Sequence, residues 1–566
     1  MRFKKVILLY FLLLIIFLPN TLSFDNQNIT LTNSKIPTIK INVKPYSKVY
    51  EGDIIDCEIS GDPDILYWQI NNQSKHYAFY ENKPIIFDPE LTPLNDTYVN
   101  LTIYAENSAG NTSTTLPILI KRIFFGDIHW HSTLCDGRHS IDTMYSNAIE
   151  DNYLDFVAYS GHGEFIDRID LGYPRVFFQN LLQLILHGRT EWKTMKEKAQ
   201  EYYKEGEFTT FLGFEWSACQ AYPGGYKRST NGWNDVSHIN FYYKDIYPNA
   251  SKYSAYDTYT YDDIFKVMNE EAENGNLNIG FTHHPQARAY WLEIGNKHFF
   301  PISFTVNWSF LANKINNIEE RNNVFRGAEV YSKWGTAIGQ YSHLPIHWPY
   351  STNLLSNETD AWVENALWEW SENLPGIKFV MMASSDIHLV DRPGSAQGGF
   401  LGENPAGLIA AYSIHNTRDE IWDAINTCDI YGTQLLKIRA NVRFNDQLAY
   451  GQWINYSSQL KVNITALSTF YGLDQSRKNM CPHKYDFDEL NHTISDIWLI
   501  KKDRDKGRPW CKIIGHAQPN EHMAITNFTD NDVQPNDFYY VAIRQQGQTV
   551  DDENNYMAFI GPVFIK

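Results

Sequence analysis

The sequence predicts a mixed α/β protein in which a seven-stranded β/α barrel is flanked by an N-terminal and a C-terminal β-sandwich. The chain has 566 residues, which is too long for a single hydrophobic core. Short runs of alternating apolar and polar residues fill its first and last parts, whereas apolar strands followed by amphipathic helices fill the middle. We therefore expect an immunoglobulin-like sandwich at residues 25–120, the barrel at 121–434 and a second sandwich at 435–566.

The first residues are typical of an export signal. Basic residues within Met1–Lys5 precede an unbroken apolar run from Val6 to Leu18. This run is shorter than the roughly 20 residues that span a bilayer comfortably, which favours a cleaved signal over an anchor. We expect residues 1–24 to be a signal peptide or N-terminal anchor, and the protein to be secreted or attached to the extracellular face of the membrane.

The composition is that of a folded, acidic protein. Apolar residues make up 43% of the chain and aromatic residues 15%, enough for large cores. A net charge of −18 disfavours binding to a nucleic-acid backbone. About a dozen Asn-x-Ser/Thr sequons agree with an exported glycoprotein. The six cysteines show no CxxC spacing, and the one disulfide considered joins Cys481 to Cys511.

Strands that alternate apolar and polar residues are predicted at both ends of the chain. In the N-terminal part they include Thr38–Val43 and Tyr98–Tyr104, separated by turns rich in Gly, Asp and Asn. In the C-terminal part they include Phe538–Arg544 and Phe559–Ile565.

The middle part alternates strands and helices, as in a parallel α/β barrel or an open sheet. A helix is predicted where apolar residues recur at i, i+3, i+4, i+7 and i+8 from Ile141, and another follows a capping box of Thr417 and Glu420. Further helices are predicted at 190–205, 260–274 and 358–373, and the Thr417 helix at 417–426. Seven strands are predicted at 123–131, 156–162, 210–216, 238–242, 278–284, 327–331 and 379–388.

Nearly every predicted barrel strand carries a metal-ligand residue type at one end, and in β/α barrels the carboxyl ends of the strands form the active-site face. Residues i and i+2 of a strand face the same side, which pairs His129 with His131 and Asp386 with His388. Only one of His283 and His284 is expected to face the site, and we assign His284 because Pro285 follows it. The predicted metal ligands are His129, His131, Asp136, His162, Glu215, His238, His284, Asp386 and His388.

Imidazoles and carboxylates in this number suit Zn²⁺, Mn²⁺ or Fe, and more than four ligands indicate two to three divalent ions. A single histidine is more often a hydrogen-bonded core residue than a ligand. The recurrence of such residues at strand ends favours the metal centre over that simpler explanation.

These motifs resemble those of the PHP superfamily, named for polymerase and histidinol phosphatase domains. The resemblance covers residues 122–430 and includes His129-Trp-His131, Ser160-Gly-His162, Gly213-Phe-Glu215 and Asp386-Ile-His388. It implies a distorted seven-stranded PHP-type barrel of an exported branch with flanking β-domains. It also implies one ion at His129, His131, Glu215 and Asp386, a second at Glu215, His238 and His284, and a third at Asp136, His162 and His388.

The resemblance implies a metal-dependent phosphoesterase that activates water on a small-molecule or glycan-linked phosphate ester. We assign catalytic roles to Asp136, Glu215 and Arg288. Arg288, Lys333 and Arg392 follow barrel strands and are candidates for binding phosphate. Two alternatives remain open: an amidohydrolase-type enzyme acting on a carbonyl, and a non-catalytic cell-surface binding protein on the same scaffold. Cys135 is expected to be a passive buried thiol rather than a soft ligand or a disulfide partner.

Overall fold

The computed structural model describes most of the chain from residue 35 onward. The described residues are 35–77, 79–86, 98–150, 154–167, 190–218, 237–246, 250–255, 257–286, 288–294, 297–303, 305–317, 324–344, 361–389, 391, 393, 407–434, 436–469, 493–546 and 556–566. The predicted signal segment, Cys481 and Arg392 lie outside these ranges.

The N-terminal strands form small sheets around a core that contains Trp68, Leu101 and Ile118. In the main sheet β4 pairs with β7 and β7 with β8, both antiparallel, and β2 runs parallel to β8. The strands are β1 (Thr38–Ile41), β2 (Lys48–Tyr50), β3 (Cys57–Ser60), β4 (Ile65–Ile70), β5 (Phe79–Tyr80), β6 (Lys83–Pro84), β7 (Val99–Asn107) and β8 (Gly110–Asp127).

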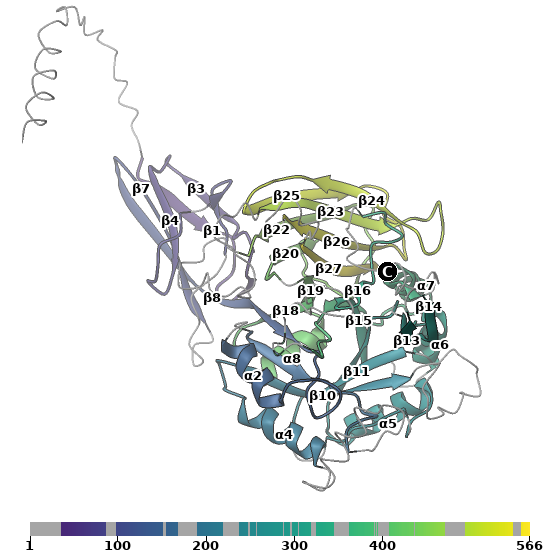
Figure 1. Ribbon diagram of the computed structural model, residues 1–566. Coiled ribbons are helices and arrows are strands. Elements are labelled where there is room, and N and C mark those ends of the chain that lie inside the picture. Colours follow the sequence, from purple (N-terminus) through teal and green to yellow (C-terminus); the bar gives the residue numbers. More distant parts are fainter. Residues whose placement is uncertain are drawn as a thin grey trace, which may run out of the picture.

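Strand β8 continues from the N-terminal sheet into the central sheet (Figure 1). Its first six residues alternate between half-buried and exposed, the next ones between buried and half-buried, and its last five residues are all buried. This change matches its partners, because β8 pairs with β7 and β2 first and then with β18 (Gly407–Ser413) and β9 (Phe156–Tyr159). One strand thus enters two sheets.

The central sheet contains the seven predicted strands in the spatial order β8, β9, β10, β11, β12, β15 and β17. The strands not yet placed are β10 (Thr209–Ala218), β11 (Ser237–Tyr243), β12 (Asn278–His283), β15 (Phe325–Ser332) and β17 (Val380–Ala383). Strand β11 is antiparallel to both β10 and β12, which departs from the parallel pattern expected.

The predicted closed seven-stranded barrel is not confirmed. Among the described residues β17 pairs with β15, while the far end of the series, β8, pairs with β18. The segments that follow β8 and β17 are linked by an isolated bridge between Trp130 and Ile387 and by neighbouring backbone hydrogen bonds, such as that from the His131 N–H to the Ile387 carbonyl at 3.0 Å, but not by a paired ladder of these two strands. Strand β18 then pairs with β19 (Ile430–Gln434), which leads the sheet into the C-terminal strands.

Helices cover the central sheet (Figure 1), and among those described all but Trp308–Asn317 lie where the sequence predicted a helix. Ile141, Met144, Tyr145 and Ala148 are buried on the first of them, which confirms the predicted stripe. Before the last helix Thr417 accepts a hydrogen bond from the Glu420 N–H, but the Glu420 carboxylate bonds to His415 instead of completing the box. The helices are α2 (Ile141–Glu150), α4 (Glu191–Glu201), α5 (Tyr261–Glu273), α6 (Trp308–Asn317), α7 (Val363–Asn373) and α8 (Arg418–Thr427).

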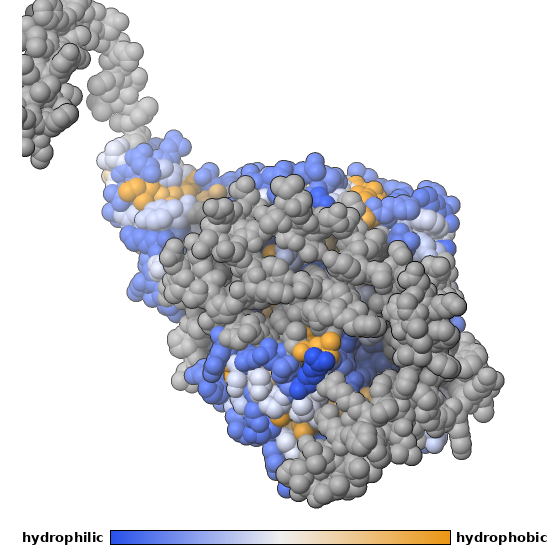
Figure 2. Space-filling model, viewed as in Figure 1, coloured by the Kyte–Doolittle hydropathy of each residue, from blue (hydrophilic) through white to orange (hydrophobic). Residues whose placement is uncertain are grey.

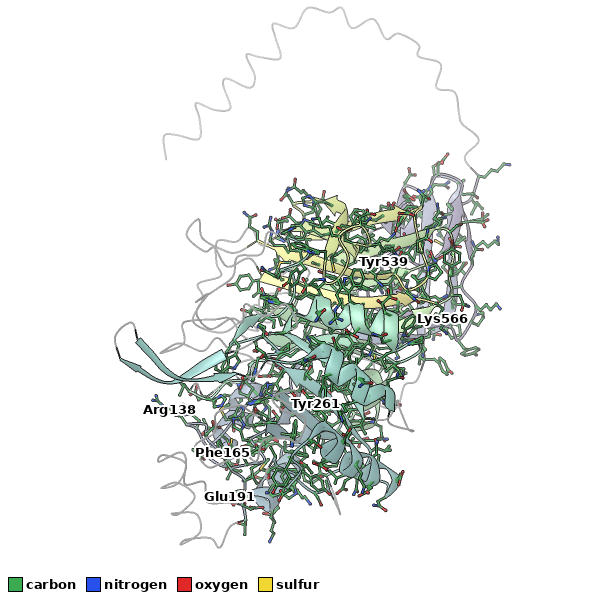
Figure 3. The ribbon with its side chains drawn as sticks, turned by 90° about the vertical axis from the view of Figure 1, so that its right-hand side faces the viewer. Arg138, Phe165, Glu191, Tyr261, Tyr539 and Lys566 are labelled. Carbon is green, nitrogen blue, oxygen red and sulfur yellow. The ribbon has the colours of Figure 1, made fainter. Side chains whose placement is uncertain are left out.

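A hairpin of β13 (Arg288–Ile294) and β14 (Lys297–Ser303) projects from the body on the side where Arg138 lies (Figure 3). It follows β12, at whose end the predicted ligands lie. A short strand, β16 (Gly335–Thr336), pairs with the end of β15.

The C-terminal strands form two sheets that share one core. One sheet has the order β20, β22, β25, and the other continues from β19 through β27, β26 and β23 to β24, with β21 beside β27. Val462 and Ile464 of the first sheet lie in the same core as Val541 of the second and Ile409 of the central sheet. These strands are β20 (Arg439–Phe444), β21 (Gln452–Ile454), β22 (Leu460–Leu467), β23 (Ile494–Lys502), β24 (Cys511–Ala517), β25 (Met523–Asp530), β26 (Phe538–Gln545) and β27 (Tyr556–Ile565).

An ion pair and a hydrogen bond attach the turn after β2 to the C-terminal strand β20. Arg443 Nε donates to Asp53 Oδ1 at 2.6 Å, and Asn441 Nδ2 donates to the backbone carbonyl of Glu51 at 3.0 Å.

Figure 2 shows that much of the described surface in this view is hydrophilic. Among the described residues, no helix is both long and apolar enough to cross a bilayer.

A buried carboxylate on α7 makes the stability of the fold sensitive to pH. Glu364 Oε1 accepts hydrogen bonds from the backbone N–H groups of Gly339 at 2.6 Å and Tyr341 at 3.2 Å. Burial nevertheless raises the pKa of Glu364 to about 7, from a usual value near 4.5. Folding therefore favours its protonated form, and stability is lost as pH rises from the lower to the higher value.

We expect Glu364→Gln to remove this pH dependence. The unfolding free energy of the variant relative to wild type should be higher at pH 8 than at pH 5, by up to about 3 kcal/mol. Denaturant titrations at both pH values measure the difference. The exposed Glu205→Gln is the control and should show none; an equal offset of Glu364→Gln at both pH values would contradict the argument.

Candidate metal centre

The predicted ligands meet at one edge of the central sheet. His129 and His131 follow the end of β8, His162 follows β9, and Asp386 and His388 follow β17. His238 lies near the start of β11, and because β11 is antiparallel its start lies at the same edge as the carboxyl ends of its neighbours. Because β11 runs antiparallel to its neighbours, it can place a ligand at this edge only through its first residues.

The first group of side chains is completely buried and contains four donor atoms. His129 Nε2 lies 3.5 Å from Glu215 Oε2 and 3.4 Å from Asp386 Oδ1. His131 Nε2 lies 3.3 Å and 3.1 Å from the same two oxygens. These are the four residues that the family resemblance assigned to one ion.

The spacing of these atoms tests whether a metal fits. Four donors around one Zn²⁺ at its usual bond lengths are separated by about 3.3 to 3.5 Å. The four measured distances span 3.1 to 3.5 Å. His129 Nε2, His131 Nε2 and Glu215 Oε2 are also buried without a hydrogen-bond partner among the described residues. Such atoms are costly in a protein interior unless something else binds them, so the residues fit a cation.

A second group surrounds the other oxygen of Glu215. Glu215, His238, His283 and His284 each offer a donor atom, and these atoms lie within 4.8 Å of one another. His238 Nδ1 contacts Glu215 Oε1, and His283 Nε2 lies 3.5 Å from the same oxygen. His284 Nε2 lies 3.7 Å from Asp386 Oδ2.

The expectation that only one of the adjacent histidines faces the site is wrong. Strand β12 ends at His283, and His284 has a φ of 29°, in the left-handed region, so the alternation of strand side chains stops between them. Both side chains are buried, and their ring centroids lie 4.3 Å apart. The i, i+2 argument for Asp386 and His388 was also incorrect in detail, because β17 ends at Ala383 and Asp386 has a φ of 53°.

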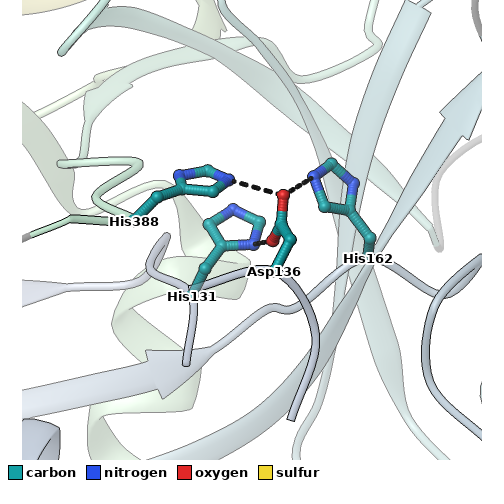
Figure 4. A group of neighbouring side chains, drawn as sticks. All are labelled: His131, Asp136, His162 and His388. Carbon is teal, nitrogen blue, oxygen red and sulfur yellow. Dashed lines mark ion pairs between the residues drawn. The ribbon is translucent and has the colours of Figure 1, made fainter. Parts of the chain in front are cut away.

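A third group lies at the rim of the centre (Figure 4). Asp136 Oδ2 lies 3.5 Å from His162 Nε2 and 3.2 Å from His388 Nε2, and Asp136 Oδ1 lies 3.3 Å from His131 Nδ1. The side chains of Asp136, His162 and His388 are 14 to 19% exposed, unlike the first two groups. His131 borders two groups through different ring nitrogens.

Two carboxylates that the sequence analysis missed hold the ligands in place. Glu329 on β15 accepts from the His284 N–H at 3.1 Å, and its other oxygen lies 3.1 Å from His129 Nδ1 and contacts Ser384. Asp127, at the end of β8, accepts from the His129 N–H at 3.1 Å. The sequence offered one sign of the role of Glu329, which is an acidic residue in the middle of a predicted strand. The structure shows that this strand, Phe325–Ser332, is buried throughout.

Of the three cations predicted to bind phosphate, the structure describes the side chain of Lys333. Its Nζ lies 3.2 Å from Asp386 Oδ1 and 2.6 Å from His388 Nδ1, so it already contacts the ligand set. Trp334 Nε1 donates to Asp386 Oδ2 at 2.5 Å. Arg288 is the first residue of β13, but its side chain, like all of Arg392, lies outside the described part.

Opposite charges dominate the titration of the first group, His129, His131, Glu215 and Asp386. Burial opposes ionisation of Glu215 and Asp386, but the surrounding histidines outweigh it and hold both pKa values well below the usual range. Burial likewise opposes protonation of His129, yet Asp386, Glu215 and Glu329 raise its pKa to about 9. In the absence of a cation, protons balance the carboxylates, so a metal and protons compete for these atoms.

Cys135 lies beside the rim group. Its Sγ is 3.5 Å from His131 Nδ1 and accepts a hydrogen bond from the Tyr159 hydroxyl at 3.2 Å. The thiol is free and buried, as is that of Cys511. The partner considered for Cys511, Cys481, lies outside the described residues.

Comparisons with known proteins give few matches. No curated protein matches the chain. A two-domain protein from Bacteroides vulgatus, described as containing a predicted PHP-like metal-dependent phosphoesterase, is 12% identical at a TM-score of 0.31, over 78% of this chain and 95% of that one. Two β-glucuronidases, from Bacteroides uniformis and Parabacteroides merdae, are each 8% identical at TM-scores of 0.16. The match to the Bacteroides uniformis enzyme covers 95% of this chain and 62% of that one. The match to the Parabacteroides merdae enzyme covers 92% of this chain and 77% of that one.

TM-scores of this size do not establish a shared fold. The chain is also similar to a family described as protein of unknown function (DUF3604), which matches residues 174–285. That stretch contains Glu215, His238, His283 and His284, the complete second group of the centre.

Proposed function

We propose that the protein is a metal-dependent hydrolase, most specifically a phosphoesterase, that uses two to three divalent ions. The observation that carries the proposal is the spacing of the buried donor atoms. His129, His131, Glu215 and Asp386 contribute atoms 3.1 to 3.5 Å apart, which is the separation expected of ligands that share one ion. Within the described part of the chain, three of these atoms have no hydrogen-bond partner.

The two oxygens of Glu215 face the first and second groups, so Glu215 is suited to bridge two ions. Asp136, His162 and His388 would hold a third ion at the rim, where water and substrate have access. Bound together, such ions lower the pKa of water and neutralise charge on a phosphoryl group or its leaving oxygen. Zn²⁺, Mn²⁺ and Fe all suit this ligand set.

The protein side chains would then orient the substrate and the ligands. Lys333 and Trp334 both donate to Asp386, which fixes that carboxylate towards His129 and His131. Asp136 is the carboxylate with the most exposure in the centre, so we assign it the contact with the attacking water or the leaving group. Arg288 begins the hairpin that projects beside the ligand edge, and we assign it a role in binding phosphate.

We further propose that the substrate is an extracellular phosphate ester, either a small molecule or a glycan-linked ester. Support comes from the export signal that the sequence predicts and from the acidic net charge, which disfavours nucleic acid. A substrate panel of phosphomonoesters, phosphodiesters and amides, run with the metal found in the protein, tests the reaction class. Turnover of amides alone would replace the phosphoesterase with the amidohydrolase alternative.

We expect the purified protein to contain two to three transition-metal ions per chain, because the donor groups are complete in the described structure. His129→Ala and His388→Ala should each lower this number and lower hydrolysis by at least about 100-fold, since each removes a ligand. Elemental analysis of the chain from residue 25, purified without chelators, measures the content. His415→Ala, a buried histidine that pairs with Glu420, is the matched control. A protein that holds no metal even after reconstitution would overturn the hydrolase proposal.

Metal affinity is expected to rise with pH and to be lost in acid. His129 has a pKa raised to about 9, so at pH 7 it must release a proton to bind a cation. Below about pH 5 the protons prevail, and metal and activity should both be lost. Calorimetry in buffers of different ionisation enthalpy measures proton release, and dialysis across the pH range measures retention. A metal-loaded protein that remains active at pH 4 is the contrary result.

Glu329→Gln should weaken metal binding roughly 10- to 100-fold, the usual effect of losing a carboxylate that orients a ligating histidine. The variant removes the charge that faces His129 Nδ1 but keeps the size of the side chain. Competition with a chromophoric chelator measures the affinity. Glu364→Gln is the control, because its buried carboxylate accepts from the backbone N–H groups of Gly339 and Tyr341 and not from a residue that contacts the ligands. Unchanged affinity in Glu329→Gln would show that Glu329 does not orient the ligands.

A further inference from the structure

His283 lies in the centre although neither the residue pattern nor the family resemblance assigned it a role. Its position follows from strand register. His283 on β12 is directly opposite His238 on β11, and His238 is opposite Ser217 on β10. Residues directly opposite in adjacent strands face the same side of a sheet, and Ser217 shares its side with Glu215, two residues earlier. The register therefore directs His238 and His283 towards Glu215.

Among the residues that the structure describes, none bonds to His283 in a way that would explain a buried imidazole. The residue is completely buried, and neither ring nitrogen has a hydrogen-bond partner among the described residues. Its Nε2 lies 3.5 Å from Glu215 Oε1, which is long for a hydrogen bond but close to the separation of two ligands on one ion. A histidine kept only for packing would more commonly have at least one nitrogen bonded.

We propose that His283 is a metal ligand and that it binds the second ion together with Glu215, His238 and His284. This inference rests on the proposed function, because it presumes that the centre holds metal. Three imidazoles and one carboxylate make a full set of four protein donors, the number found at closed zinc sites. The four atoms lie within 4.8 Å of one another, so shifts of about 1 Å bring them to zinc-ligand separations.

A complete set of four protein ligands at the second ion implies that the second group and the rim group have different roles. A closed site holds its ion tightly and offers no position for water, whereas a catalytic site keeps a position open. His131 binds the first ion through Nε2 in this arrangement. Three donors then remain at the rim, namely Asp136, His162 and His388. Those three side chains are partly exposed, whereas Glu215, His238, His283 and His284 are all buried. The rim ion is thus the exchangeable one, and the ion at His283 is the tightly held one.

The test replaces His283 and follows the metal rather than catalysis alone. His283→Ala should lose one ion per chain, or bind it at least about 100-fold more weakly in chelator competition. His415→Ala, which alters a buried histidine outside the centre, should keep the full content. An unchanged number and affinity of ions in His283→Ala would overturn the proposal.

A second variant decides the question even if His283→Ala fails to fold. His283→Cys keeps a donor that zinc and cobalt accept. After loading with Co²⁺ it should show more thiolate-to-cobalt absorption in the near ultraviolet than the unsubstituted protein, which already contains Cys135 near the rim. No added absorption in a folded, cobalt-loaded His283→Cys protein would contradict the assignment. If the unsubstituted protein binds no cobalt or zinc, the proposed function itself fails, which is a separate outcome.

Discussion

The carboxylate of Glu215 is the interaction on which the rest of the centre depends. Its Oε2 faces His129 and His131, and its Oε1 faces His238 and His283. An ionised carboxylate in a protein interior is destabilised by several kcal/mol unless opposite charges and hydrogen bonds surround it. The folded chain meets this requirement with imidazoles from separate strand ends. The convergence of those strand ends at one edge is therefore an electrostatic necessity as well as a topological result.

Backbone strain at two ligands helps to explain how so many side chains converge. His284 and Asp386 both have positive φ values, 29° and 53°, which non-glycine residues adopt at a cost of about 1 to 3 kcal/mol each. Hydrogen bonds hold both conformations: His284 N–H donates to Glu329, and Asp386 N–H donates to the His129 carbonyl at 2.6 Å. The strain allows adjacent histidines to enter one centre, which a regular strand does not permit.

Residue patterns predicted where the candidate metal centre lies better than they predicted which residues surround it. Ligand residue types at successive strand ends were visible in the sequence, and the structure brings all nine predicted ligands to one edge. The role of Glu329 was not visible, because a single acidic residue in a buried strand does not reveal which histidine it contacts. His283 was excluded by a rule for regular strands that fails where β12 ends. The pairing of β18 with β8 joins residues almost 300 positions apart in the chain, and local periodicity carries no information about such pairing.

The flanking strands take part in positioning the ligands, because β8 belongs to both regions. Its Thr114 and Leu116 pair with β7 of the N-terminal sheet, while Phe124 and Phe125 pair with β18. Strand β18 is joined through β19 to β27, and residues of all these strands lie in one continuous core. Strand β8, which ends just before His129 and His131, is thus held on both sides before the chain reaches the centre. Ligands that directly follow the ends of rigid strands keep their separations when the ion is absent, and the flanking sheets supply that rigidity.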